Sequence, residues 1–151
     1  DSFWPGPLTI IMPKSDKIPP VITAGLDTVA VRFPSDPIAM ALIRKAGVPV
    51  AAPSANSSGK PSPTLAKHVI EDLSGKVDIV IDGGSTNVGV ESTVLDVTCN
   101  PPVILRPGGV TLEQISKVLP QVVAAPSAAS TGMPDSSIPR SPGMKYRHYS
   151  P

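Results

Sequence analysis

The chain contains 151 residues, of which 20 are Pro and 12 are Gly, and its formal net charge at neutral pH is only +1. A content of 40% hydrophobic residues argues against wholesale disorder, and no apolar run reaches the roughly 18 residues of a membrane span. One cysteine excludes a disulfide framework and a Cys-based zinc site, and the near-neutral charge gives no general reason to expect binding to nucleic acid or to a membrane surface. We therefore expect a soluble, cytoplasmic chain.

The first half of the chain alternates predicted strands with a predicted helix. Residues 8–12 and 29–33 are apolar or β-branched runs of the kind that form strands, and residues 48–52 form a third run that contains a Pro. Between the second and third runs, Asp36 and Pro37 supply a cap and a first-turn Pro for a helix that Gly47 ends.

The second half continues the alternation. Ser62 and Pro63 predict the start of a helix over residues 64–74, and strands are predicted at 77–81, 93–97 and 103–105. Residues 111–114 form a capping-box pattern that opens a last helix, which ends by Pro120. Strands that alternate with helices predict an α/β sheet that is at least partly parallel.

The amino-acid composition of the chain changes after Pro120. Residues 124–142 are rich in Pro, Ser and Ala, which is typical of a flexible linker, and residues 141–151 are basic and aromatic with no acidic residue. We expect two parts, a domain over residues 1–123 and a linker over residues 124–151.

Two familiar nucleotide-binding motifs are absent. Ser58-Gly59-Lys60 resembles the end of a P-loop, but Ser54 stands where that motif needs Gly, and Pro61 stands where it needs Ser or Thr. The sequence also lacks the G-x-G-x-x-G fingerprint of dinucleotide-binding folds.

Two arginines are the clearest candidates for ligand binding. Arg32 and Arg106 each stand at the C-terminal end of a predicted strand, where open α/β sheets bind their ligands. A guanidinium is a fixed fork of donors that suits carboxylate and phosphate groups. The matching positions favour an anionic ligand, with a pair of surface salt bridges as the alternative. Ser54 and Asn56 offer further polar groups after the run 48–52, and Glu91 is a lone carboxylate, a weak signal for a general base or metal ligand.

These stretches occur together in a known family. The sequence resembles the YrdC/Sua5 family in five ordered motifs and in its tail: FWPGPLT (3–9), VAVRFP (29–34), APSAN with SG (52–56, 58–59), GVESTV (89–94), LRPG (105–108) and PGMKYRHY (142–149). The tail resembles the linker of the Sua5 form rather than the shorter YrdC form. The resemblance implies a twisted, open, mixed sheet with flanking helices around a concave cavity.

The resemblance also implies a function. Members of the family make threonylcarbamoyl-AMP from L-threonine, bicarbonate and ATP, with Mg²⁺ accompanying the ATP, and the product serves the t6A modification of tRNA. On this pattern Arg32, Ala52 and Ser92 would bind threonine. The nucleotide would contact residues from four of the motifs and from the tail, namely Thr28, Ser54, Asn56, Ser62, Arg106, Tyr146 and His148. Residues 124–151 would then contribute a lid, tRNA would be an indirect partner, and no catalytic residue would act covalently.

The resemblance covers only part of the family's sequence, and two other functions remain open. No counterpart of the family's basic Lys-x-Arg element precedes Asp1, and the C-terminal domain of the Sua5 form is expected beyond Pro151, so we expect little synthase activity from residues 1–151 alone. One alternative is a module that binds double-stranded RNA, and another is a YrdC-like domain of a carbamoyl-transfer enzyme.

Overall fold

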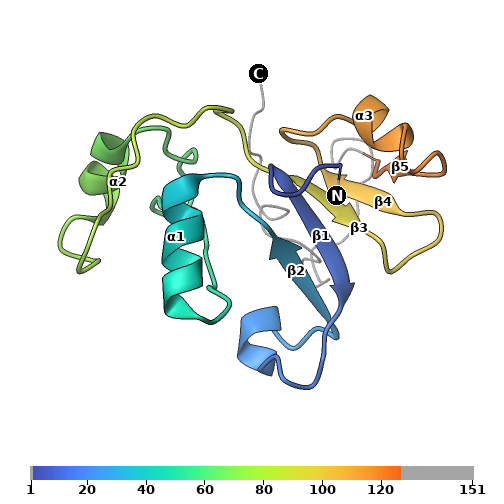
Figure 1. The fold of residues 1–151 in the computed structure, drawn as a ribbon, viewed down its shortest axis with the longest axis horizontal. Helices are drawn as coiled ribbons and strands as arrows, with labels where there is room; N and C mark the ends of the chain where they lie inside the picture. The colour runs from blue at the N-terminus through green and yellow to red at the C-terminus, as the bar shows by residue number, and fades with distance from the viewer. Residues whose placement is uncertain (1, 127–151) are drawn as a thin grey trace.

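The computed structural model describes residues 2–126 and contains a five-stranded mixed sheet (Figure 1). The strands are β1 (Leu8–Pro13), β2 (Thr28–Arg32), β3 (Thr93–Asp96), β4 (Val103–Arg106) and β5 (Val123–Ala124), in the spatial order β2-β1-β3-β4-β5. β1 pairs antiparallel with β2 and parallel with β3, whereas β4 pairs antiparallel with β3 and parallel with β5. The predicted α/β class with a mixed, open sheet is confirmed.

The core lies under the centre of the sheet and is almost entirely aliphatic. Its buried cluster combines residues of β1, β3 and β4 with residues that follow them, namely Leu8, Leu95, Ile104, Val110, Ile115 and Val122. Phe3 and Trp4 pack against this cluster from outside, and the Trp4 indole donates a hydrogen bond to the Leu8 carbonyl oxygen at 2.8 Å. All four residues of β3 are buried, so the motif that leads into this strand is anchored to the best-packed part of the molecule.

Two of the three predicted helices begin as their caps indicate. In α1 (Pro37–Ala46), the Asp36 carboxylate accepts a hydrogen bond from the Ala39 amide, and Gly47 closes the helix in the left-handed conformation at φ 67°. In α3 (Leu112–Ser116), Thr111 and Gln114 exchange both hydrogen bonds of a capping box.

The start predicted for the helix after Ser62 is wrong. α2 (Ala66–Leu73) begins four residues after Ser62, and Leu65 at its N-cap makes no side-chain hydrogen bond. The Ser62 hydroxyl instead makes a contact distant in sequence, donating to the Glu91 carboxylate at 2.7 Å.

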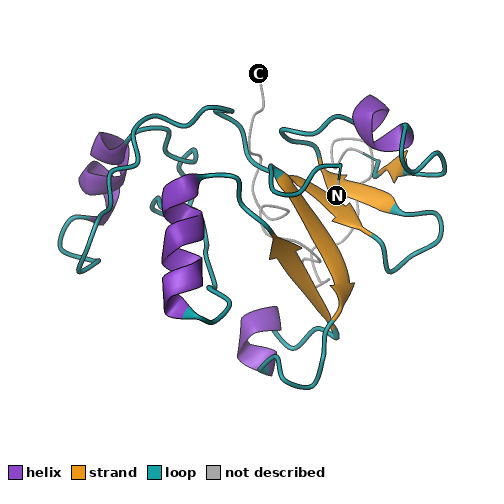
Figure 2. Ribbon diagram, viewed as in Figure 1, coloured by secondary structure: helices purple, strands orange, loops and turns teal. Residues whose placement is uncertain are grey.

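The strands predicted at residues 48–52 and 77–81 are also absent from the described part of the chain. Figure 2 shows loop on both sides of α2, where these two runs lie. Val48 is 61% exposed and Ile79 is 78% exposed, so neither run is covered. A strand needs a neighbouring strand to accept and donate its ladder hydrogen bonds, and neither run has one among residues 2–126. An apolar run by itself predicts a strand without supplying its partner.

The short strand β5 lies where the sequence predicted the end of the domain. Val123 donates to the Pro102 carbonyl oxygen and Ala125 donates to the Ile104 carbonyl oxygen, which attaches this segment to the edge of β4. Ala124, the first residue of the predicted linker, therefore belongs to the sheet. Residues 127–151, and with them the tail residues Tyr146 and His148, lie outside the described residues.

Candidate functional site

One end of the sheet brings the two predicted arginines into the same row. Arg32 at the end of β2 is paired with Thr9 of β1, Thr9 with Val94 of β3, and Val94 with Arg106 at the end of β4. The two arginines are thus three strand spacings apart, about 14 Å between Cα atoms, and their side chains bridge part of that gap. The sequence predicted that each arginine stands at the end of a strand. The order and directions of the strands put both ends at the same end of the sheet.

Arg106 is held on several sides by the protein. Its Nη1 lies 2.7 Å from Glu91 Oε2 in an ion pair whose side chains are only 19% and 13% exposed. Nε and Nη2 donate to the Ser92 carbonyl oxygen at 3.2 and 2.9 Å, and Nη2 also donates to Ser92 Oγ at 3.2 Å. A guanidinium fixed in this way is pre-organised to present its charge in one direction.

Within residues 2–126, the Arg32 side chain makes a single hydrogen bond. Its Nε donates to the Gly6 carbonyl oxygen at 3.2 Å, and Gly6 in turn donates to the Phe33 carbonyl oxygen, which fixes the base of the side chain. Its two terminal nitrogens have no hydrogen-bond or ion-pair partner within residues 2–126. Partial burial, and then the positive charge of Arg106, lower the pKa of the Arg32 guanidinium from its ordinary value. Among the described residues, Arg32 therefore offers an unpaired fork that an anion would stabilise.

A chain of polar contacts connects this end of the sheet to the loop before α2. The Thr9 and Ser92 hydroxyls lie 2.7 Å apart, Ser92 contacts Arg106, Arg106 pairs with Glu91, and Glu91 accepts from Ser62. Ser92 is buried and Ser62 is half-buried. Of the residues predicted to bind ligands, Arg32, Ser92, Arg106 and Ser62 thus belong to one connected region.

Thr9 and Glu91 are the residues that the candidate site adds to the prediction. Thr9 ends the first of the quoted motifs and had no role assigned to it, although its position in an apolar strand was a signal for a functional hydroxyl. In the sequence, Glu91 was noted only as a lone carboxylate. In the structure it connects Ser62 and Arg106, two residues that are distant from it in sequence.

The remaining predicted residues lie farther from the arginines. Thr28 stands at the opposite end of β2 from Arg32, about 13 Å along the strand, and points to the same face. Ala52 and Ser54 are exposed in the loop after residues 48–50, and the Asn56 side chain donates only within its own loop, to the Ser57 and Lys60 carbonyl oxygens. No contact among the described residues joins Ala52, Ser54 or Asn56 to the two arginines.

The loop that carries Ser54 and Asn56 is tied to α2 by one carboxylate. Asp72 pairs with the Lys60 ammonium and accepts a hydrogen bond from the Ser57 amide at 3.2 Å. These interactions, the hydrogen bond from Lys60 first, lower the pKa of the Asp72 carboxyl from its ordinary value. The loop geometry therefore depends on this carboxylate being ionised.

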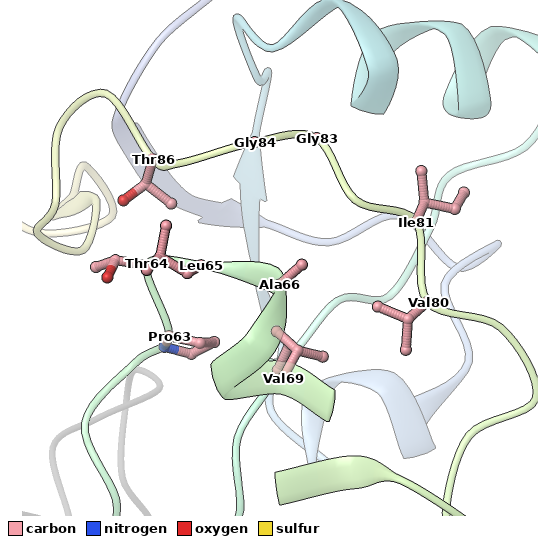
Figure 3. A pocket seen from close by; sticks show the side chains of 11 residues that line it. Pro63, Thr64, Leu65, Ala66, Val69, Val80, Ile81, Gly83, Gly84 and Thr86 are labelled. Atoms are coloured by element: carbon pink, nitrogen blue, oxygen red, sulfur yellow. The ribbon is translucent and has the colours of Figure 1, made fainter. Parts of the chain in front are cut away.

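An apolar hollow opens immediately beside Ser62. Its volume is about 290 Å³. Residues of α2 and of the loops on both sides of it line the hollow, as Figure 3 shows, namely Ala55, Pro63, Thr64, Leu65, Ala66, Val69, Val80, Ile81, Gly83, Gly84 and Thr86. The Thr86 amide donates to the Thr64 carbonyl oxygen at 3.0 Å and closes one wall.

The described part of the chain contains no cluster of three or more His, Cys, Asp or Glu side chains able to hold a metal ion. Within residues 2–126, no helix has the length and apolar character needed to cross a bilayer.

The fold defines an α/β protein that carries Arg32 and Arg106 in one row at one end of a mixed sheet. Residues 1–108 match the Sua5–YciO–YrdC family model, described as telomere recombination, and residues 110–151 match the model for the C-terminal domain of threonylcarbamoyl-AMP synthase. The chain belongs to the Sua5–YciO–YrdC family.

Its relatives and structural neighbours agree with this membership. The chain is 56% identical to the threonylcarbamoyl-AMP synthase of Pyrococcus abyssi (strain GE5 / Orsay) over 149 residues, which cover 99% of this chain and 43% of the relative. It is 55% identical to the Bacillus subtilis (strain 168) synthase over 151 residues, which cover 99% of this chain and 42% of that relative. The chain therefore spans about two fifths of the length of these curated relatives.

Two solved structures show the same fold. The crystal structure of P. abyssi Sua5 complexed with L-threonine matches with a TM-score of 0.89 and 57% identity, covering 99% of this chain and 43% of that one. The crystal structure of E. coli YciO matches with a TM-score of 0.60 and 30% identity, covering 69% of this chain and 51% of that one.

Proposed function

We propose that this chain provides threonine- and nucleotide-binding parts of a threonylcarbamoyl-AMP synthase, a transferase that moves the adenylyl group of ATP. The observation that carries the proposal is that the two terminal nitrogens of Arg32, in the same row as Arg106, have no partner within residues 2–126. It is supported by relatives that bear the name of this synthase and by the neighbouring structure bound to L-threonine.

In the proposal, Arg32 binds the threonine carboxylate through its two terminal nitrogens. A carboxylate matches a guanidinium in shape and charge, and the pair becomes stronger where burial already disfavours an unpaired cation. Ser92, held between Thr9 and Arg106, contributes its hydroxyl to the threonine site, and Ala52 is proposed to line the same site. Arg106 then binds a phosphate of ATP.

The chemistry needs positioning and charge more than it needs a covalent group. The neutral amine of threonine attacks the carbon of bicarbonate, and water leaves with the third oxygen and the amine proton, which gives a carbamate. A carbamate oxygen then attacks the α-phosphorus of ATP, the bond between the α-phosphorus and the bridging oxygen breaks, and pyrophosphate leaves with that electron pair. Donors fixed in advance stabilise the charge that develops at phosphorus. Exclusion of water protects the labile carbamate.

The partners of the reaction follow from this scheme. ATP, L-threonine and bicarbonate are the proposed substrates, and tRNA receives the threonylcarbamoyl group only in a later reaction. The proposed location of the activity is the cytoplasm. Mg²⁺ is proposed to enter on the phosphates of ATP, and no described residue is assigned to it as a ligand.

Calorimetric titration of the 151-residue chain with L-threonine tests the role of Arg32. Hydrogen bonds to a charged group contribute about 1.5–3 kcal/mol, so Arg32→Ala should weaken threonine binding by about tenfold or more. Arg44→Ala, at an exposed position in the last turn of α1, is the matched control and should leave the affinity unchanged. Equal affinities for the wild-type chain and the Arg32→Ala variant would contradict the proposal.

The reaction itself is tested by pyrophosphate release from ATP with threonine and bicarbonate present. Release that requires both co-substrates supports the synthase, and we expect residues 1–151 alone to turn over far more slowly than the P. abyssi relative. Carbamoyl phosphate that binds in place of threonine would favour the carbamoyl-transfer alternative. Salt-sensitive binding of double-stranded RNA without ATP binding would favour the RNA-binding one.

A further inference from the structure

Two hydroxyl groups near the row that contains Arg32 and Arg106 contact each other, and together they leave one proton unused. Thr9 Oγ1 and Ser92 Oγ lie 2.7 Å apart, so one of these hydroxyls donates to the other. Ser92 Oγ also accepts a hydrogen bond from Arg106 Nη2 at 3.2 Å. A hydroxyl has a single proton, and neither hydroxyl has a further partner within residues 2–126. Whichever of the two donates, the pair therefore keeps one O–H group that is free to bind a ligand.

The free proton belongs to Thr9 when Ser92 is the donor between the two hydroxyls. Arg106 is a cation that donates to Ser92, and a hydroxyl that accepts from a charged donor becomes a stronger donor itself. The hydrogen bonds then run in one direction, from Arg106 to Ser92 and from Ser92 to Thr9. Exposure agrees with this direction, because Ser92 is only 6% exposed, whereas Thr9 is half-buried and can be reached by a ligand.

The register of the sheet places Thr9 beside Arg32. The two residues are directly opposite each other in the antiparallel pair of β1 and β2, so their side chains leave the same face of the sheet with Cβ atoms about 5 Å apart. The Arg32 Nε is fixed on the Gly6 carbonyl oxygen, two residues before β1, and its terminal nitrogens have no partner within residues 2–126. The Thr9 hydroxyl and the end of the Arg32 guanidinium are therefore neighbouring donors that still need an acceptor.

This set of donors determines which group of an amino acid it can bind. A carboxylate has about four lone-pair sites, so it can accept from a guanidinium and from a hydroxyl at the same time. An ammonium group only donates, and the positive charge of Arg32 would repel it. The amine of a bound amino acid is therefore left outside these contacts, where it stays available for reaction.

We propose that Thr9 is a further threonine-binding residue, whose hydroxyl donates to the same carboxylate that Arg32 binds. Ser92 is a positioning residue for Thr9 in this arrangement, because it donates to a lone pair of the Thr9 oxygen and turns the Thr9 proton towards the substrate. The inference rests on the proposed function, in which the bound carboxylate is that of L-threonine, and it specifies how Ser92 acts in that site.

Calorimetric titration of the 151-residue chain with L-threonine tests the Thr9 hydroxyl. Thr9→Val replaces the hydroxyl with a methyl group and keeps a residue that suits a strand, so it should weaken threonine binding about tenfold, the effect of one hydrogen bond to a charged group. Thr9→Ser keeps the hydroxyl and should retain most of the affinity. Thr86→Val, at an exposed threonine in the loop after α2, is the matched control and should leave the affinity unchanged. Equal affinities for the wild type and Thr9→Val would overturn the inference.

A second ligand distinguishes a lost contact from a disturbed sheet. The compound 1-aminopropan-2-ol is threonine without its carboxylate, so it lacks the proposed acceptor of the Thr9 proton. Thr9→Val should therefore bind this compound as the wild type does, however weakly, whereas a disturbed sheet would weaken the binding of both ligands alike. If Thr9→Val lost as much affinity for 1-aminopropan-2-ol as for L-threonine, the Thr9 hydroxyl would not act on the carboxylate and the inference would be wrong.

Ser92→Ala tests which of the two hydroxyls carries the free proton. Thr9 keeps its own proton in this variant and loses only its positioning partner, so we expect a smaller loss of threonine affinity than in Thr9→Val. A larger loss in Ser92→Ala would assign the donated proton to Ser92 and overturn the inference. Arg32→Ala separates the two proposals. A loss of threonine affinity with Arg32→Ala but not with Thr9→Val refutes only this inference, whereas a wild-type chain that binds no threonine refutes both.

Discussion

Gly108 is the position where one added methyl group should most disturb the sheet and the candidate site together. A Cβ atom at Gly108 would lie 2.4 Å from the Glu91 carbonyl oxygen and 2.5 Å from both the Ser92 carbonyl carbon and the Thr93 amide nitrogen. All three neighbours are backbone atoms, so no side-chain rotation relieves the overlap. We therefore expect Gly108→Ala to push the segment after β4 away from the start of β3.

The size of the effect follows from the contacts that this movement breaks. Overpacking typically destabilises a protein by about 1–3 kcal/mol. The displacement also stretches the hydrogen bond from the Gly109 amide to the Glu91 carbonyl oxygen and the one from the Val110 amide to the Thr93 hydroxyl, both 3.0 Å long and each contributing about 1 kcal/mol. The free energy of unfolding should fall by about 3 kcal/mol or more. With a urea slope of about 2 kcal/mol per molar, the midpoint falls by about 1.5 M.

Urea unfolding followed by the fluorescence of Trp4, the only tryptophan of the chain, measures this change. Gly83→Ala is the matched control, because its Cβ would meet only the Ile38 Cδ1 atom at an ordinary 3.6 Å. The control should keep the wild-type midpoint within about 0.3 M, or raise it slightly through the unfolded state. A Gly108→Ala midpoint equal to that of Gly83→Ala would refute the reasoning.

Three further predictions concern other parts of the molecule. Thr111→Ala removes half of the capping box of α3 and should lower the free energy of unfolding by about 1 kcal/mol in the same assay; no change would contradict the cap. Because the pKa of Asp72 is lowered in the folded state, its bond to Lys60 stabilises the loop above the ordinary carboxyl pKa and is lost as the pH falls through the lowered value. NMR titration of Asp72 should show this low midpoint, and Lys60→Met should raise it. The uncovered apolar runs 48–52 and 77–81 should bind an apolar dye such as anilinonaphthalene sulfonate, and Ile79→Ser should reduce the signal.

The fold was predictable wherever a local signal decides the structure. The carboxylate of Asp36, the left-handed Gly47 and the Thr111–Gln114 box act within a few residues of the helix end that they fix, and α1 and α3 begin where these residues place them. The runs at 48–52 and 77–81 carry an equally strong apolar signal, but a strand requires a second strand at ladder distance. The sequence of one run contains no information about that neighbour, so these predictions failed.

The residues of the candidate site were also predictable only where a local sequence signal identifies them. Arg32 and Arg106 were found because each follows a recognisable strand, and the sheet order then placed them in one row. Glu91 was only a lone carboxylate in the sequence, because Ser62 lies 29 residues before it and Arg106 lies beyond the whole of β3. Both partners of Glu91 come from segments that only the folded chain brings together, so the pattern around Glu91 could indicate a carboxylate but not the contacts that it makes.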